Sequence, residues 1–158
     1  MATSAQLVEE YLAGPQALRK SVTGMSREQL RARPVAGKWS TLEVVCHLAD
    51  FDPILADRMK RIIAEDRPTL LGADEKQFSA RLAYHERDVE EELAIIENTR
   101  RQMGRILRTL PAEAMARVGI HNERGTLTLE SMVGLAIRHI PHHLKFIAEK
   151  RKALGLPA

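Results

Sequence analysis

Three of the chain's six histidines lie within five residues of one another: His139, His142 and His143. Residues four apart on an α-helix stand one turn above each other, so the imidazoles of His139 and His143 can converge on one ion. The apolar residues around them repeat with helical spacing, which places His143 on the buried face, His139 at its border and His142 toward the polar side. The pair therefore indicates either two ligands of a metal or two buried, hydrogen-bonded imidazoles.

A third histidine, His47, lies on the flank of the apolar face of another amphipathic segment, which begins near Thr41. Neighbouring helices of a bundle can bring it beside His139 and His143. Three imidazoles without a fourth protein ligand are typical of a catalytic metal site, in which water or substrate takes the open position. Nitrogen ligands suit zinc, nickel, cobalt, iron or copper and do not select among these metals. We expect one divalent transition metal, with zinc and nickel as the first candidates.

Other polar residues near these positions are candidates for catalysis. Arg58 lies on the same flank as His47 and can bind a carboxylate or phosphate at the mouth of a cleft, or pair with a surface acid. Glu92 falls within the apolar arc of its own segment and is either a general base or a carboxylate at the rim. Asp50, one turn after His47, either accepts the second ring proton of a histidine ligand or is exposed. We therefore predict Glu92 and Arg58 as catalytic side chains.

Four further residues fit less directly. His142 would join the site if its helix were rotated, and His85 and His121 fall at helix-end and loop positions from which either can line a pocket. Cys46 points about 100° away from its neighbour His47 on a helix, so we interpret it as a packed thiol and not as a nucleophile.

Four long segments with helical hydrophobic periodicity must position these residues, and they cover approximately residues 6–22, 41–64, 89–110 and 126–154. Capping boxes that begin at Ser26, Ser40 and Asp74 predict helix starts, two of them for short helices in the connections. No strand-like alternation extends beyond a few residues. The pattern predicts an all-α, up-and-down four-helix bundle with short extra helices in its connections.

Two prolines interrupt this pattern. Pro15 predicts a kink in the first segment, or two short helices end to end, because proline lacks an amide donor. Pro53 predicts a bend after His47 that either widens the bundle into a cleft or has no role. Residues 112–125 form an irregular stretch, with a short extended piece at 117–120.

The length of 158 residues is typical of one domain, which we expect to span residues 1–158. The single Cys46 excludes an intramolecular disulfide, and the residues after Met1 lack the apolar run of a signal peptide, so we expect a cytoplasmic protein. No apolar run approaches the length of a membrane span. Basic residues are mixed with acidic ones along the chain, the net charge is +3, and aromatic residues make up 4%. We therefore expect no binding to nucleic acid or membranes.

Taken together, these pieces resemble the DinB-like superfamily of bacterial four-helix metalloproteins, in particular its YfiT-like branch of metal-dependent hydrolases. The matching stretches cover nearly the whole chain and comprise residues 34–40, 43–50, 74–78, 125–129 and 139–143. In that family, the first histidine of the second helix and an HxxxH motif in the last helix hold the metal. The resemblance therefore implies His47, His139 and His143 as ligands.

The resemblance also implies a homodimer and, for some members, transferase or isomerase activity with low-molecular-weight bacterial thiols. A metal with an open position favours thiolate or hydroxide near neutral pH. We therefore expect an enzyme with a small-molecule substrate, in which either water attacks, as in a hydrolase, or a small thiol attacks an electrophile, as in a transferase. The alternative is a non-catalytic, dimeric metal-binding or stress-response module, whose site a fourth ligand such as Glu92 or His142 would close.

Overall fold

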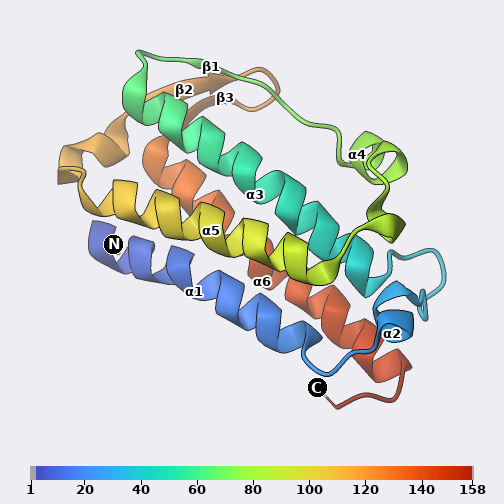
Figure 1. The fold of residues 1–158 in the computed structure, drawn as a ribbon. Coiled ribbons are helices and arrows are strands. Elements are labelled where there is room, and N and C mark those ends of the chain that lie inside the picture. The colour runs from blue at the N-terminus through green and yellow to red at the C-terminus, as the bar shows by residue number, and fades with distance from the viewer. Residues whose placement is uncertain (1–2, 158) are drawn as a thin grey trace.

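Four long helices form a bundle in the computed structural model, which describes residues 3–157 (Figure 1). They are α1 (Ser4–Val22), α3 (Thr41–Ala64), α5 (Val89–Arg108) and α6 (Leu129–Ala153). Their connections contain the short elements α2 (Arg27–Arg31), β1 (Thr69–Leu70), α4 (Glu75–Arg81), η1 (Tyr84–Glu86), η2 (Ala112–Ala116), β2 (Val118–His121) and β3 (Gly125–Thr128). The predicted four-helix bundle with short helices in its connections is confirmed, and a small sheet is added to it.

Side-chain caps fix where the helices begin. At the start of α3, the Ser40 hydroxyl accepts a hydrogen bond from the Glu43 amide, and the Glu43 carboxylate accepts one from the Ser40 amide at 2.7 Å. The predicted capping box at Ser26 is present in the same form, and Asp74 caps α4 by accepting from two amides of its first turn. Because each cap satisfies amides that have no partner within the helix, these starts are encoded locally.

The first helix continues through Pro15 as a single element, so the alternative of two short helices is wrong. Pro15 has no amide to donate to the carbonyl of Tyr11, one turn earlier. The guanidinium of Arg100, which comes from α5, donates to that carbonyl at 2.9 Å instead. A long-range hydrogen bond thus replaces the one that proline removes.

The four helices do not follow one another around the bundle in sequence order. Both α1 and α3 pack against α5 and α6, so α1 lies diagonally opposite α3, and α5 opposite α6. Figure 1 shows that α3 and α5 run in the same direction, as do α1 and α6. This arrangement corrects the expected up-and-down order. Parallel neighbours need a connection that returns along the bundle, and residues 65–88, which contain β1 and α4, supply it.

A three-stranded sheet covers one end of the bundle (Figure 1). Strand β1 pairs in parallel with β2, with Leu70 opposite His121, and β2 pairs antiparallel with β3. The extended piece predicted at residues 117–120 is therefore confirmed as most of β2. Gly125 closes the turn between β2 and β3 with a φ of 71°, a conformation that glycine adopts without strain. The sheet ties the connection after α3 to the segment that leads into α6.

A buried ion pair joins all four helices at the middle of the bundle. Arg100 of α5 and Asp52 of α3 have side chains that are each 1% exposed, and Arg100 donates to Asp52 at 3.0 Å from Nε and 2.7 Å from Nη2. The same guanidinium donates to the carbonyls of Tyr11 in α1 and Ala136 in α6. A Cβ atom at position 14 would lie 2.6 Å from Arg100 Nη1, so Gly14 is what lets α1 approach this group.

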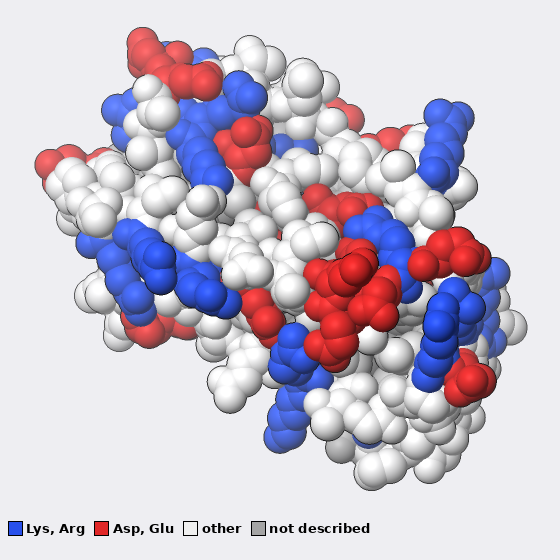
Figure 2. All heavy atoms as spheres, in the orientation of Figure 1, with Lys and Arg blue, Asp and Glu red and all other residues white. Residues whose placement is uncertain are grey.

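The apolar core consists of two clusters, one on each side of this ion pair. One contains Tyr11, Met59, Met103 and Met132, and the other contains Leu18, Leu48, Ile96 and Ile147. Outside the core, basic and acidic side chains are interspersed on the face drawn in Figure 2. Within residues 3–157, none of the helices combines the length and hydropathy needed to cross a bilayer.

Replacing one member of the buried pair should destabilise the fold strongly, because its partner would keep an uncompensated charge. We expect Arg100→Met or Asp52→Ala to lower the free energy of unfolding by about 3–5 kcal/mol each, and the double variant to lose less than the sum. Urea denaturation measures this, with Arg101→Met on the exposed side of α5 as the control. Losses below about 1 kcal/mol for the single variants would show that the pair does not hold the bundle together.

Candidate metal centre

The imidazoles of His47, His139 and His143 meet between α3 and α6. One nitrogen from each ring can be chosen so that all three lie within 4.8 Å of one another. The Nε2 atoms of His47 and His139 are 3.0 Å apart, and His47 is 2% and His143 9% exposed. The structure thus brings together the three histidines that the sequence pattern selected.

Aromatic side chains pack around this cluster. The rings of Trp39 and Phe51 lie 5.3 and 4.6 Å from the imidazole of His47, measured between centroids. Trp39 precedes the cap of α3, and Phe51 stands one turn after His47 on the same helix. These rings shield the histidines from water and hold their side chains in place.

All three imidazoles are held in the neutral form. Burial lowers the pKa of His47 to about 4, although the charge of Asp50 opposes it. Burial, and then the neighbouring histidines, lower the pKa values of His139 and His143 to about 3. The Nδ1 atom of each ring is buried without a hydrogen-bond partner among residues 3–157. Neutral imidazoles are the form that binds a metal, and buried nitrogens without partners are costly unless a ligand uses the ring. The cluster therefore fits a divalent transition metal.

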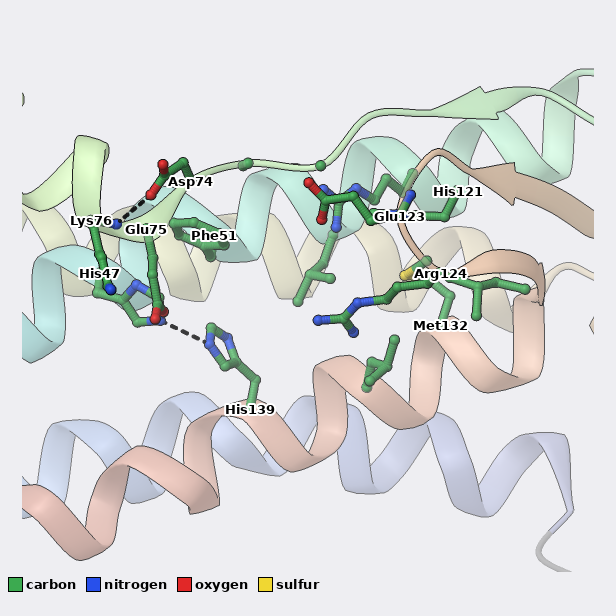
Figure 3. A pocket seen from close by; sticks show the side chains of 16 residues that line it. His47, Phe51, Asp74, Glu75, Lys76, His121, Glu123, Arg124, Met132 and His139 are labelled. Carbon is green, nitrogen blue, oxygen red and sulfur yellow. Dashed lines mark hydrogen bonds between the residues drawn. The ribbon is translucent and has the colours of Figure 1, made fainter.

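Two cavities reach the histidines from different sides. The larger, about 680 Å³, is lined by His47 and His139 together with the connection after α3, and Figure 3 shows it from close by. The other, about 670 Å³, is lined by all three histidines, with Trp39 and Phe146. A small molecule can therefore approach the cluster from either side.

The cluster has three protein ligands and no fourth. Within residues 3–157, no carboxylate, thiol or further histidine joins His47, His139 and His143 at mutual ligand distances. His142 lies on the exposed side of α6, where it lines the second cavity. Glu92 is absent from the walls of both cavities. The arrangement is that of an open site, in which a position remains for water or substrate.

Glu92 and Asp50 are both held by Arg87. The guanidinium donates to the two oxygens of Asp50 at 3.0 and 2.7 Å and to Glu92 Oε1 at 2.9 Å. Asp50 therefore neither supports the ring of His47 nor lies fully exposed, since its side chain is 15% exposed. Glu92 belongs to α5, which lies diagonally opposite the helix of His139, and this explains why its carboxylate is far from the cavity walls.

The remaining candidates occupy different places. Arg58 lines the larger cavity and donates to the Leu71 carbonyl, and His121 is buried in the wall of the same cavity. The Nε2 atom of His85 lies 3.0 Å from Glu43 Oε1, away from the cluster. Burial raises the pKa of the Cys46 thiol to about 12, which confirms the interpretation of a packed thiol.

The sequence pattern missed Glu75, the only acidic residue among 3–157 that lines both cavities. Glu75 is the first residue of α4, and Figure 3 shows its side chain extending from α4 into the cavity, on the side where His47 lies. In the sequence it appears as part of a helix start and of the stretch 74–78 that resembles the family, without a role in the site. Its position depends on the path of the connection between α3 and α5, which the helical periodicity did not specify.

Comparison with known proteins agrees with this geometry. The sequence profile of the DinB superfamily matches residues 10–147. The chain belongs to the DinB superfamily. A "putative metal-dependent hydrolase" of Oceanobacillus iheyensis is 31% identical over 140 residues, which are 87% of this chain and 81% of that protein. The "putative metal-dependent hydrolase YfiT" of Bacillus subtilis is 30% identical over 151 residues, covering 95% and 83% of the two chains.

One similar solved structure is that of YfiT from Bacillus subtilis, described as "a probable metal-dependent hydrolase with an unusual four-helix bundle topology". It superimposes with a TM-score of 0.90 at 27% identity, over 98% of this chain and 89% of that one. The resemblance to the YfiT-like branch is thus confirmed. The helix order of this DinB protein, described above, likewise differs from that of a bundle whose helices follow one another in sequence order.

Metal content should depend on each of the three histidines. We expect His47→Ala, His139→Ala and His143→Ala to bind a divalent metal at least about tenfold more weakly, because an open three-ligand site has no spare donor. Elemental analysis of untagged protein and metal titration measure this. His142→Ala is the matched control, and equal metal in all four variants would remove these histidines from the site.

The metal-free protein should become less stable as the pH falls. Folded-state pKa values of about 4 and 3 lie below the usual value of 6.5, so below pH 6.5 the unfolded chain binds protons that the folded chain does not. We expect a loss of about 2 kcal/mol per histidine between pH 7 and pH 5. Urea denaturation across this range checks it, and His47→Ala should show a shallower dependence on pH.

Proposed function

We propose that this DinB protein is a metal-dependent hydrolase that acts on a small molecule at His47, His139 and His143. The open cluster of three neutral imidazoles at the junction of two cavities is the observation that carries the proposal. The names of the similar proteins from Oceanobacillus and Bacillus support it. The all-nitrogen donor set suits zinc or nickel.

A divalent metal held by these imidazoles would supply Lewis acidity, which polarises a substrate oxygen and lowers the pKa of water. The chain's own residues would do the rest. Glu75 faces the cluster from α4 and can accept the proton of an attacking water, and Lys76 beside it lines both cavities. Phe51 and Trp39 keep bulk water from the imidazole of His47. This assigns the role of general base to Glu75 and leaves Glu92 bound to Arg87.

Thiol transfer is a second candidate, and the second cavity is the observation that favours it. A hydrolase needs room for one organic substrate, whereas a transferase must hold a thiol and an electrophile at the same time. The two cavities meet at His47 and His139, and each exceeds 600 Å³. Lys150, buried beside Phe146 in the second cavity, adds a positive charge that would suit an acidic small thiol.

Glu75→Gln tests the proposed proton acceptor. We expect kcat for hydrolysis of an activated ester to fall by about 10²–10⁴-fold while the metal content stays unchanged, since the amide cannot accept a proton. Steady-state kinetics of the zinc- and nickel-loaded protein measure this. Glu91→Gln, an exposed charge change on α5, is the control. An unchanged kcat in Glu75→Gln would exclude this residue as the base.

Product analysis separates the candidate reactions. Electrophilic substrates are incubated with the metal-loaded protein, with and without a small thiol, and the products are identified by mass spectrometry. Turnover without thiol supports hydrolysis, and turnover that requires thiol and gives a thioether or thioester supports transfer. Bound metal without turnover of either kind would favour a non-catalytic metal-binding module.

A further inference from the structure

The larger cavity is lined by two arginines. Arg58 comes from α3 and Arg124 from the turn between β2 and β3, far apart in sequence. Figure 3 shows Arg124 extending from this turn into the cavity, with its guanidinium toward His139. The cavity therefore holds the histidine pair at one end, and Arg124 enters it from the turn at the other.

The charge of Arg58 is only partly offset by nearby carboxylates, those of Glu123 and Asp57. Neither its guanidinium nor that of Arg124 forms an ion pair with a carboxylate of residues 3–157, unlike those of Arg87 and Arg100. Arg58 donates a hydrogen bond from Nη2 to the Leu71 carbonyl, and its buried Nε has no partner within the described chain. Burial, and then the charge of Arg124, lower the pKa of Arg58. A bound anion would relieve both the burial and the repulsion.

His121 adds a neutral donor in the same wall. The Glu123 amide donates to its Nδ1 at 3.1 Å, so the neutral ring carries its proton on Nε2. The residue is 3% exposed and lines the cavity with the two arginines. Guanidinium forks beside an N–H donor are the groups that recognise carboxylate and phosphate oxygens.

Backbone contacts hold the turn that carries Arg124 in place. The backbone amide of Asn122 donates to the Leu70 carbonyl at 3.0 Å. The side-chain oxygen of Asn122 accepts from the Gly72 amide at 2.8 Å. A Cβ at position 72 would lie 2.6 Å from the Glu123 carboxylate, so that acid packs against the connection after β1. The backbone that carries the exposed side chain of Arg124 is thus held in place, which reduces the cost of binding.

We infer that Arg58 and Arg124 bind an oxyanion of the substrate, a carboxylate or a phosphate, while the reacting group lies at His47 and His139. The substrate class is a small molecule with an anionic group at one end and the bond to be broken at the other. The identity of the reacting end rests on the proposed function. The binding of the oxyanion does not, because it uses none of the three histidines.

Equilibrium binding to the full chain tests the inference without relying on activity. Glutarate, inorganic phosphate and the uncharged glutaramide are titrated into the protein as purified and after chelation, and the Nε–H signals of arginine are followed by NMR. We expect glutarate or phosphate, but not glutaramide, to shift two arginine signals in both preparations. Arg124→Gln should remove one signal and weaken binding at least about tenfold. Arg124→Lys, which keeps the positive charge but lacks the two parallel N–H donors of a guanidinium, should weaken binding less.

Arg105→Gln, the same charge change at an exposed position on α5, is the matched control and should leave the affinity unchanged. The tighter of the two oxyanions identifies whether the substrate carries a carboxylate or a phosphate. Equal affinity for glutaramide, unchanged affinity in Arg124→Gln, or binding that is lost on chelation would overturn the inference. Loss of hydrolysis with intact oxyanion binding would instead count against the proposed function alone.

Discussion

The guanidinium of Arg100, which belongs to α5, contacts the other three long helices. These contacts constrain how the four helices are placed relative to one another. The guanidinium pairs with Asp52 and donates to the carbonyls of Tyr11 and Ala136 at the boundary between the two apolar clusters. A buried charge is tolerated only where its hydrogen bonds are complete. The four helices must therefore keep fixed positions along the bundle axis relative to one another. Ala136 lies three residues before His139, and Asp52 lies five residues after His47. The ion pair thus sets the relative height of the helices that carry the histidines.

The order of the helices determines what surrounds the metal centre. Because α3 and α5 are parallel neighbours, the chain must return along the bundle between them, and this connection passes over the histidines with Glu75 on its inner side. The small sheet fastens the connection to the turn that carries Arg124. The cavity is therefore built from two connecting segments laid over one helix pair. Its floor is part of the packed bundle, while its walls lie in loops, where changes in sequence alter specificity at little cost to the fold.

Burial gives the three histidines their chemistry. Removing them from water lowers their pKa values far enough that all three are neutral at physiological pH, and the charge of Arg100 lowers that of His139 further. Neutral rings with free lone pairs are prepared for a cation, whereas exposed histidines would be partly protonated in mildly acidic conditions. Glu75 and Arg124, two charged side chains of the larger cavity, are exposed and remain available to a substrate.

The sequence by itself determined the helices, their caps and the selection of His47, His139 and His143, because capping and the 3.6-residue period are short-range effects. It did not determine the helix order. Glu92 is a candidate base from its place in the apolar arc of its own helix, and only the fold shows that its carboxylate pairs with Arg87. Arg100 stands at a core position of α5 between Ile96 and Met103, yet its partner could not be named from one helix. Which faces meet, and over which residues a connection passes, is decided by long-range packing, which no local pattern contains.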